Sequence, residues 1–404
     1  MNRDRRILLF IYWMALLQGL TIMLMPPLFR SVGKAFHVGM AQQGELQSAF
    51  YFGGLAIGIA GGVLFERLGT KATSVVSILL ISVGALMMGL APEHWILIAG
   101  GVLFGMGNGW LSVVFSAAVA DRFSERRQKV FTWAMLFLAV GGSIGPYLFS
   151  ILLKHSPSWR IPLLGLGALL AATGLILWIV RTPSLDAIRA KKEPHEGSYL
   201  AVLRSGRLWL TTMLFLLHGF AGGILVAWVG RLYQDRLSIT DDRAALLLSV
   251  NAAGFFIGRV ILGTWLAGKL PDRTLLGICA SAGTVAFVLV NLGSNYILAL
   301  IVMAGFGVVM SGDAPSIYSL VARHFAADSG VAFALVQAMG ALGSTSGPWL
   351  IGWLGESYGL RKAIWFGPLF LLALAVLTLS WEFIERRKML WSSAEGLPDV
   401  NSGS

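Results

Sequence analysis

Apolar runs of about 20 residues, separated by short polar loops, recur along the whole chain of 404 residues. Each run is long enough to cross roughly 30 Å of hydrocarbon, because an α-helix rises about 1.5 Å per residue. Twelve such runs lie near residues 7–29, 43–65, 72–91, 95–120, 130–153, 161–180, 208–230, 245–267, 274–293, 297–322, 331–353 and 363–384. The pattern predicts an all-α membrane protein with twelve transmembrane helices.

Two polar segments interrupt this pattern. Residues 181–207 form the only long polar stretch between runs, and most of their charges are basic. We expect them to be a cytoplasmic linker between an N-terminal six-helix bundle (1–180) and a C-terminal six-helix bundle (208–390). The small and polar residues 391–404 predict a disordered tail.

The two halves contain a repeated sequence. Residues 104–148 align without a gap on residues 306–350. Phe104 and Gly105 match Phe306 and Gly307, and Gly145-Pro146 matches Gly347-Pro348. Chance hardly explains this agreement, so the chain is a duplication. Parallel repeats joined by a cytoplasmic linker are typical of one class of secondary transporters, in which the halves surround a central cavity.

The composition agrees with lipid as the surrounding medium. Hydrophobic residues make up 56% of the chain and charged residues 13%, against roughly 25% charged in a soluble domain. The net charge of +11 does not indicate nucleic acid, because the basic residues occupy short loops. Of 31 Lys and Arg residues, 21 lie on the side of the N-terminus, 9 on the opposite side, and Arg259 within a run. Basic loops face the cytoplasm, so both termini are expected there.

No pattern of an enzyme or a cofactor site stands out. The sequence lacks H-E-x-x-H, paired cysteines and a P-loop, so neither a metal, ATP nor another cofactor is expected. Gly141, Ser143 and Gly145 spell the G-x-S-x-G of hydrolases. That motif requires a strand–turn–helix, whereas these residues lie within an apolar run. Small residues four apart instead indicate closely packed membrane helices.

The loop after the second run, GVLFERLGTK, carries a recognisable motif. Gly62, Glu66, Arg67, Gly69 and Lys71 resemble the loop between helices 2 and 3 of the major facilitator superfamily, with Glu in place of the usual Asp. Gly69 permits a tight turn. Glu66 can pair with Arg122 or Arg126 at the end of helix 4, forming a latch that biases the two access states. In the second half Ala267 stands where the acid would be, so the latch is expected on one side only.

A narrower resemblance is to the fucose-permease-like branch of that superfamily. It rests on the G-x-G-N-G start of helix 4, which includes Asn108, on Arg126-Arg127, on Gly145-Pro146 and on Trp159-Arg160. The branch's asparagine, histidine and glutamate in helices 4, 5 and 7 are replaced here by Ser116, Met135 and Ala221. Helix 1 lacks the carboxylate that proton-coupled sugar members use. The resemblance therefore does not imply a sugar substrate.

Polar residues at membrane depth are costly, which makes them functional candidates. The resemblance implies that helices 1, 4, 7 and 10 line the central cavity. Gln18 and His218 occupy matched midplane positions in helices 1 and 7, so we expect both to face this cavity; the alternative is helix–helix hydrogen bonding. Asn108 and Gln337 are weaker candidates on helices 4 and 11.

Arg259 and Asp313 carry the most specific hypothesis. Both lie roughly 5–6 Å inward of the midplane, on helices 8 and 10, at about 1.5 Å per residue. Arg259 is predicted to bind an anionic substrate group through its planar fork, and Asp313 to hold Arg259 when the site is empty. Alternatively, Arg259 extends to the cytoplasmic face and Asp313 caps a helix break before Pro315.

The sequence thus predicts a twelve-helix transporter that moves a small organic solute, with an organic anion favoured, by alternating access. Proton coupling through Asp313, facilitated diffusion and anion exchange stay open. A sugar permease is one alternative, and a non-transporting sensor or assembly factor is another. We expect a monomer in the plasma membrane, with a bacterial inner membrane favoured, and no nucleic-acid partner.

Overall fold

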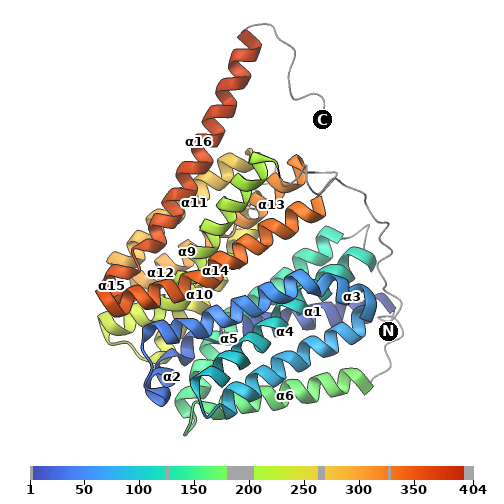
Figure 1. The fold of residues 1–404 in the computed structure, drawn as a ribbon, viewed down its shortest axis with the longest axis vertical. Helices are drawn as coiled ribbons and strands as arrows, with labels where there is room; N and C mark the ends of the chain where they lie inside the picture. The colour runs from blue at the N-terminus through green and yellow to red at the C-terminus, as the bar shows by residue number, and fades with distance from the viewer. Residues whose placement is uncertain (1–2, 123–126, 180–203, 263–268, 326–328, 395–404) are drawn as a thin grey trace.

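A computed structural model describes residues 3–122, 127–179, 204–262, 269–325 and 329–394 (Figure 1). Within these ranges the regular structure is entirely helical, as the apolar runs predict. Ten described segments are long and apolar enough to cross a membrane. The other two predicted spans, 43–65 and 331–353, are also helical. The predicted fold class is confirmed.

The helices of the N-terminal half follow the predicted runs closely. They are α1 (Arg3–Ile22), α2 (Phe29–Phe36), α3 (Met40–Leu90), α4 (His94–Arg122), α5 (Arg127–His155) and α6 (Arg160–Ile179), with a 3-10 turn at Pro26–Leu28. The first predicted span is interrupted at the two prolines. The second and third spans form α3, which turns at Gly69 with φ of 77°. Because this φ favours glycine, Gly69 makes the tight turn expected of it.

The C-terminal half begins at Gly206, slightly before the predicted boundary. Its helices are α9 (Gly206–Leu237), α10 (Asp241–Ile261), α11 (Asp272–Leu292), α12 (Tyr296–Met310), α13 (Asp313–His324), α14 (Ser329–Tyr358), α15 (Leu360–Ala363) and α16 (Phe366–Ala394). The tenth predicted span is broken at Ser311-Gly312. Helix α16 continues to Ala394, into the predicted tail.

Close approach of helix backbones holds each half together. A Cβ added to Gly141 on α5 would lie 2.4 Å from the carbonyl oxygen of Leu16 on α1. The repeat-related Gly343 on α14 would meet the carbonyl oxygen of Leu216 on α9 at 2.2 Å. The duplication therefore extends to packing, and the G-x-S-x-G pattern of α5 serves this packing, as expected for membrane helices.

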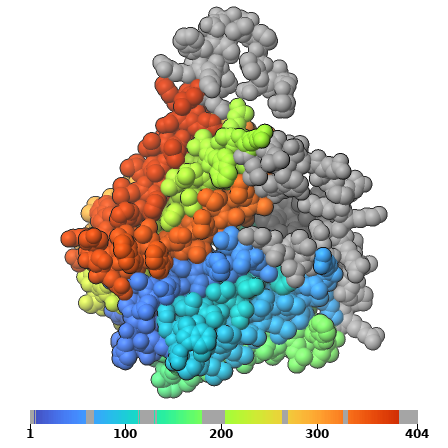
Figure 2. Space-filling view, viewed as in Figure 1, coloured from blue at the N-terminus to red at the C-terminus, as the bar shows by residue number. Residues whose placement is uncertain are grey.

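The two halves meet along α3 with α14 and α5 with α10, and the space-filling view shows α14 directly against α3 (Figures 1 and 2). Ion pairs cross between the halves from Arg30 to Asp241 at 3.6 Å and from Lys154 to Asp242 at 3.7 Å. Glu356 Oε1 accepts a hydrogen bond from the Ala41 backbone at 3.0 Å. All these residues lie in or beside loops predicted to face outside, so we define this group of contacts as the outer closure.

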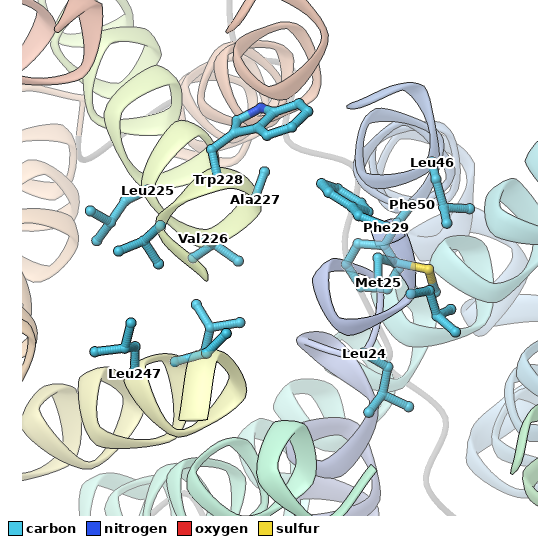
Figure 3. Close-up of a cluster of buried hydrophobic side chains, with 14 of the residues drawn as sticks. Leu24, Met25, Phe29, Leu46, Phe50, Leu225, Val226, Ala227, Trp228 and Leu247 are labelled. Atoms are coloured by element: carbon cyan, nitrogen blue, oxygen red, sulfur yellow. The ribbon is translucent and has the colours of Figure 1, made fainter. Parts of the chain in front are cut away.

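Aromatic packing lies beneath these polar contacts. Trp228 on α9 and Phe29 on α2 point toward one another with ring centroids 5.3 Å apart (Figure 3). Trp228 is fully buried, and its indole nitrogen donates to the carbonyl oxygen of Pro348 at 2.9 Å. Met25, Leu46 and Phe50 belong to the same buried cluster (Figure 3). Buried apolar side chains thus occupy the space between the halves beneath the polar contacts.

We predict that Gly141→Ala destabilises the protein, because the new methyl group has no room beside Leu16. Overpacking of this kind costs about 1–3 kcal/mol, so the midpoint of thermal unfolding in detergent should fall. Gly165→Ala on α6 is the matched control, since nothing lies within 4 Å of a Cβ there. Equal midpoints for the two variants would contradict the close packing of α1 and α5.

Candidate functional site

A cavity of about 160 Å³ lies directly inward of the outer closure, between the two halves. Met23 and Tyr51 contribute from the N-terminal half, and the remaining lining comes from α9, α10, α12 and α14. The polar side chains among the lining residues are Tyr51, His218, Asn251 and Ser344. We call this space the central cavity. Its lining is mostly apolar with a few polar groups, as in many small-molecule sites.

His218 connects the central cavity with a buried carboxylate. Its Nδ1 atom lies 3.3 Å from Oδ2 of Asp313, and the two side chains are 18% and 0% exposed. Asp313 Oδ1 has no hydrogen-bond partner among the described residues. Only His218 of this pair lines the cavity, so the imidazole lies between the cavity and the buried carboxylate.

The helix break explains why Asp313 lies there. α12 ends at Met310 and α13 begins at Asp313, which places the carboxylate in the first turn of a helix. A helix N-terminus favours negative charge. Pro315 lies in the same turn, where a missing backbone N–H is tolerated. The break agrees with the alternative interpretation of the sequence, in which Asp313 caps a helix break before Pro315. The carboxylate also contacts His218 on α9.

The predicted pair of Arg259 and Asp313 is wrong for this structure, because no ion pair joins these two described residues. Arg259 is exposed and donates from Nη1 to the sulfur of Met135 on α5, at 3.1 Å. That contact crosses between the halves. Asp313 faces α9 instead, on the other side of the break, which is why similar depth in the membrane did not bring the two side chains together.

A series of aromatic contacts connects His218 with Gln337. The His218 ring stacks on Phe215 with centroids 5.5 Å apart, and Phe215 packs edge-on against Tyr318 at 5.4 Å. The Tyr318 hydroxyl donates to Gln337 Oε1 at 2.5 Å and interacts electrostatically with Arg259. Phe215 and Tyr318 were missed from the sequence. Phe215 lies three residues before His218, so helical spacing could have identified it.

Gln18 and Asn108 belong to helix packing instead. Gln18 Nε2 donates to the carbonyl oxygen of Asn108 at 3.1 Å and to Ser112 Oγ at 2.7 Å. Thr21 donates to Asn108 Oδ1 at 2.6 Å. Gln18 is 4% exposed and Asn108 2%, and neither lines the central cavity. The expectation that Gln18 and His218 share one cavity is therefore corrected, since the polar groups of α1 and α4 bind each other.

The predicted latch can be followed only in part. Arg67 is exposed and Lys71 is half-buried, on either side of the turn at Gly69. The positions of Gly62, the side chains of Glu66 and Arg122, and all of Arg126 lie outside the described residues. The pairing of Glu66 with the end of α4 stays a prediction.

The apolar helices define a polytopic membrane protein. The cavity between its two helical bundles has room for a small solute. A family model described as the Major Facilitator Superfamily matches residues 9–325 and 232–399. The chain belongs to this superfamily, whose members among its relatives are transporters and not enzymes. It is an integral multi-pass membrane protein and a transporter of small solutes.

Relatives with named solutes span most of the chain. It is 25% identical to the cyanate transport protein CynX of Escherichia coli (strain K12), over 91% of this chain and 94% of that protein. It is 26% identical to a gentisate transporter of Corynebacterium glutamicum, over 80% and 75%. It is 24% identical to the L-fucose-proton symporter of Escherichia coli (strain K12), over 90% of each chain.

A solved structure has the same fold. The bacterial homologue of the human lysosomal transporter Spinster, in an inward-facing and unoccupied conformation, superposes with a TM-score of 0.75. The alignment covers 94% of this chain and 96% of that chain at 15% sequence identity.

We expect a cysteine at position 218 to react with a membrane-impermeant thiol reagent and a cysteine at position 18 to be protected. His218 lines the central cavity, whereas Gln18 is packed between α1 and α4. The His218→Cys and Gln18→Cys variants should be made after Cys279→Ser, because Cys279 is the chain's single cysteine. Equal labelling of both variants would restore the shared cavity that the sequence predicts.

Proposed function

We propose that this transporter carries a small organic anion by alternating access, and that the structure corresponds to a state closed on the outside. The observation that carries the proposal is the central cavity, which is lined from both halves and covered by the outer closure. If Arg30 separated from Asp241 and Lys154 from Asp242, the central cavity would open to the outside. The proposal places both termini in the cytoplasm and the protein in a bacterial inner membrane.

The preference for an anion is supported by charge. Arg259 contacts a thioether and has no carboxylate partner among the described residues. A guanidinium without an acidic partner favours binding of a carboxylate or another planar anion. Arg259 does not line the central cavity itself, but it lies one turn beyond Phe255, which does. Cyanate and gentisate, the solutes named for two relatives, are anions at neutral pH.

Two alternatives are less well supported. A sugar substrate is suggested by the similarity to the L-fucose-proton symporter, but the first predicted span, residues 7–29, contains no carboxylate. A non-transporting sensor would be favoured by a collapsed, apolar space between the halves. The central cavity instead presents polar side chains from α3, α9, α10 and α14.

Proton coupling is proposed to use the pair of His218 and Asp313. The imidazole contacts both the cavity and the buried carboxylate, so the pair can take up a proton on one side and release it on the other. Histidine suits this role because its unperturbed titration lies near physiological pH. The matched counterpart in α1 is Gln18, which cannot carry a proton in this way.

Transport measurements test the function and its coupling together. In proteoliposomes, we expect uptake of labelled gentisate or cyanate to be driven by a pH gradient. Asp313→Asn and His218→Gln should reduce this driven uptake by at least about tenfold, while exchange of internal for external solute persists. His155→Gln, at an exposed site in the other half, is the control. Gradient-driven uptake of L-fucose alone would favour the sugar alternative, and no uptake of any of the three would favour the sensor.

The predicted latch at Glu66 is proposed to act at the cytoplasmic end of the N-terminal half, opposite the outer closure. Glu66 would pair with Arg122 or Arg126 and stabilise the outward-facing state by about 1–3 kcal/mol, the usual range of coupling energies. Glu66→Gln should therefore shift the population toward the inward-facing state, measured as altered thiol labelling of Tyr51→Cys. If the variant left both labelling and transport kinetics unchanged, the latch would have no role.

A further inference from the structure

A second hollow lies in the C-terminal half, beside the end of α10 and the break between α12 and α13. Above the break, α10 and α12 are in close contact: a Cβ on Gly254 would meet the carbonyl oxygen of Ala304 at 2.1 Å, and one on Gly258 that of Val308 at 2.3 Å. Below the break, α13 packs on α11, α9 and α14. A groove of about 330 Å³ lies between the end of α10, the start of α11 and α13. This falls within the range of roughly 300–1,000 Å³ that is typical of small-ligand sites.

The groove is distinct from the central cavity, since their linings share no residue. The two are nevertheless neighbours along the same helices. On α10, Phe255 lines the cavity and Arg259 lines the groove one turn later. At the break, Met310 lines the cavity and Ser311 the groove. A solute that leaves the cavity away from the outer closure would meet the groove next.

Charge is distributed unevenly along the groove. At one end, Arg323 pairs with Asp272 at 3.1 Å, and Ser319 donates to the same carboxylate at 2.7 Å. At the other end, Arg259 has only the Met135 sulfur, a weak acceptor, and the Tyr318 hydroxyl nearby. Among the described lining residues the groove therefore carries one uncompensated positive charge, at Arg259.

An unsatisfied hydroxyl provides an independent indication of a ligand. Ser316 lines the groove, is 2% exposed, and its Oγ has no hydrogen-bond partner among the described residues. A buried hydroxyl without a partner is unfavourable. An acceptor atom bound in the groove would remove that deficit once the Ser316 side chain rotates about its Cα–Cβ bond, because Oγ has almost no accessible surface in this structure.

We propose that the groove between α10, α11 and α13 is a second anion-binding site, which takes a carboxylate or phosphate group. The Arg259 guanidinium donates two hydrogen bonds to the anion and the Ser316 hydroxyl donates another. The group can come from a soluble solute or from an anionic lipid headgroup. Use of the site as a release step for the transported anion rests on the proposed function, whereas the binding itself does not.

Binding of benzoate to the purified full chain, measured by titration calorimetry in a neutral detergent, tests the site. The wild type should bind two benzoate molecules, one in the central cavity and one in the groove. Arg259→Gln should weaken one of these events by at least about tenfold, and Arg259→Lys should fall between, because Lys keeps the charge without the planar fork. Arg243→Gln, at the opposite end of α10, is the matched control.

Ser316→Ala separates ligand binding from a structural role. Removing an unpaired buried hydroxyl should leave the thermal unfolding midpoint unchanged or higher, while benzoate binding in the groove becomes several-fold weaker. A lower midpoint with unchanged binding would show that Ser316 is structural. Unchanged binding in both Arg259→Gln and Ser316→Ala would overturn the proposal.

Further arms identify the source of the anion and separate this site from the proposed function. In nanodiscs, weaker benzoate binding with phosphatidylglycerol than with phosphatidylcholine would assign the groove to a lipid headgroup, and equal binding to a soluble solute. His218→Gln should weaken only the binding of benzoate in the central cavity. If no organic anion is transported but Arg259→Gln still removes one event, the function fails and the groove stands. If transport requires His218 but the Arg259→Gln variant binds two benzoate molecules as the wild type does, only the proposal of the groove site fails.

Discussion

The interruption of the tenth membrane span at Ser311-Gly312 determines where the functional groups of the C-terminal half lie. Ser311 and Gly312 keep right-handed helical dihedral angles, so the interruption is local. It starts a new helix at Asp313, whose first turn favours a carboxylate. That carboxylate contacts His218 on α9, whereas Arg259 on α10 lies beside the groove. Asp313 and Arg259 thus share a depth in the membrane but have different neighbours.

Closure on one side depends on a different kind of contact. Backbones of α3 and α14 approach closely where a Cβ on Gly352 would lie 2.5 Å from the carbonyl oxygen of Met40. Ion pairs and the packing of Phe29 against Trp228 surround this point. Exposed ion pairs contribute little stability singly, so they can separate without large cost. The buried aromatic contact belongs to a larger apolar cluster that spans both halves, and the polar contacts join specific residues of the two halves.

The sequence was sufficient for the fold because its strongest signals are local or repeated. Run length fixed the number of spans, the 202-residue offset between Phe104 and Phe306 revealed the two halves, and Gly69 marked a real turn. The site was harder to predict. Depth placed Arg259 and Asp313 together, but depth carries no information about which way a side chain points around a helix. Gln18 was similarly a polar residue at the right depth that turned toward α4.

The two halves therefore use equivalent positions for different purposes. In the N-terminal half, Gln18, Thr21 and Asn108 form hydrogen bonds with one another across α1 and α4, which stiffens that bundle. In the C-terminal half, His218 and Asp313 form a pair of ionisable side chains instead. Both halves keep buried atoms without partners among the described residues, Gln18 Oε1 in one half and Asp313 Oδ1 and Ser316 Oγ in the other. Unsatisfied buried groups are unfavourable unless a ligand or a proton completes them. The ionisable pair beside the central cavity thus lies in the C-terminal half, whereas the hydrogen-bonded side chains of Gln18, Thr21 and Asn108 in the other half are neutral.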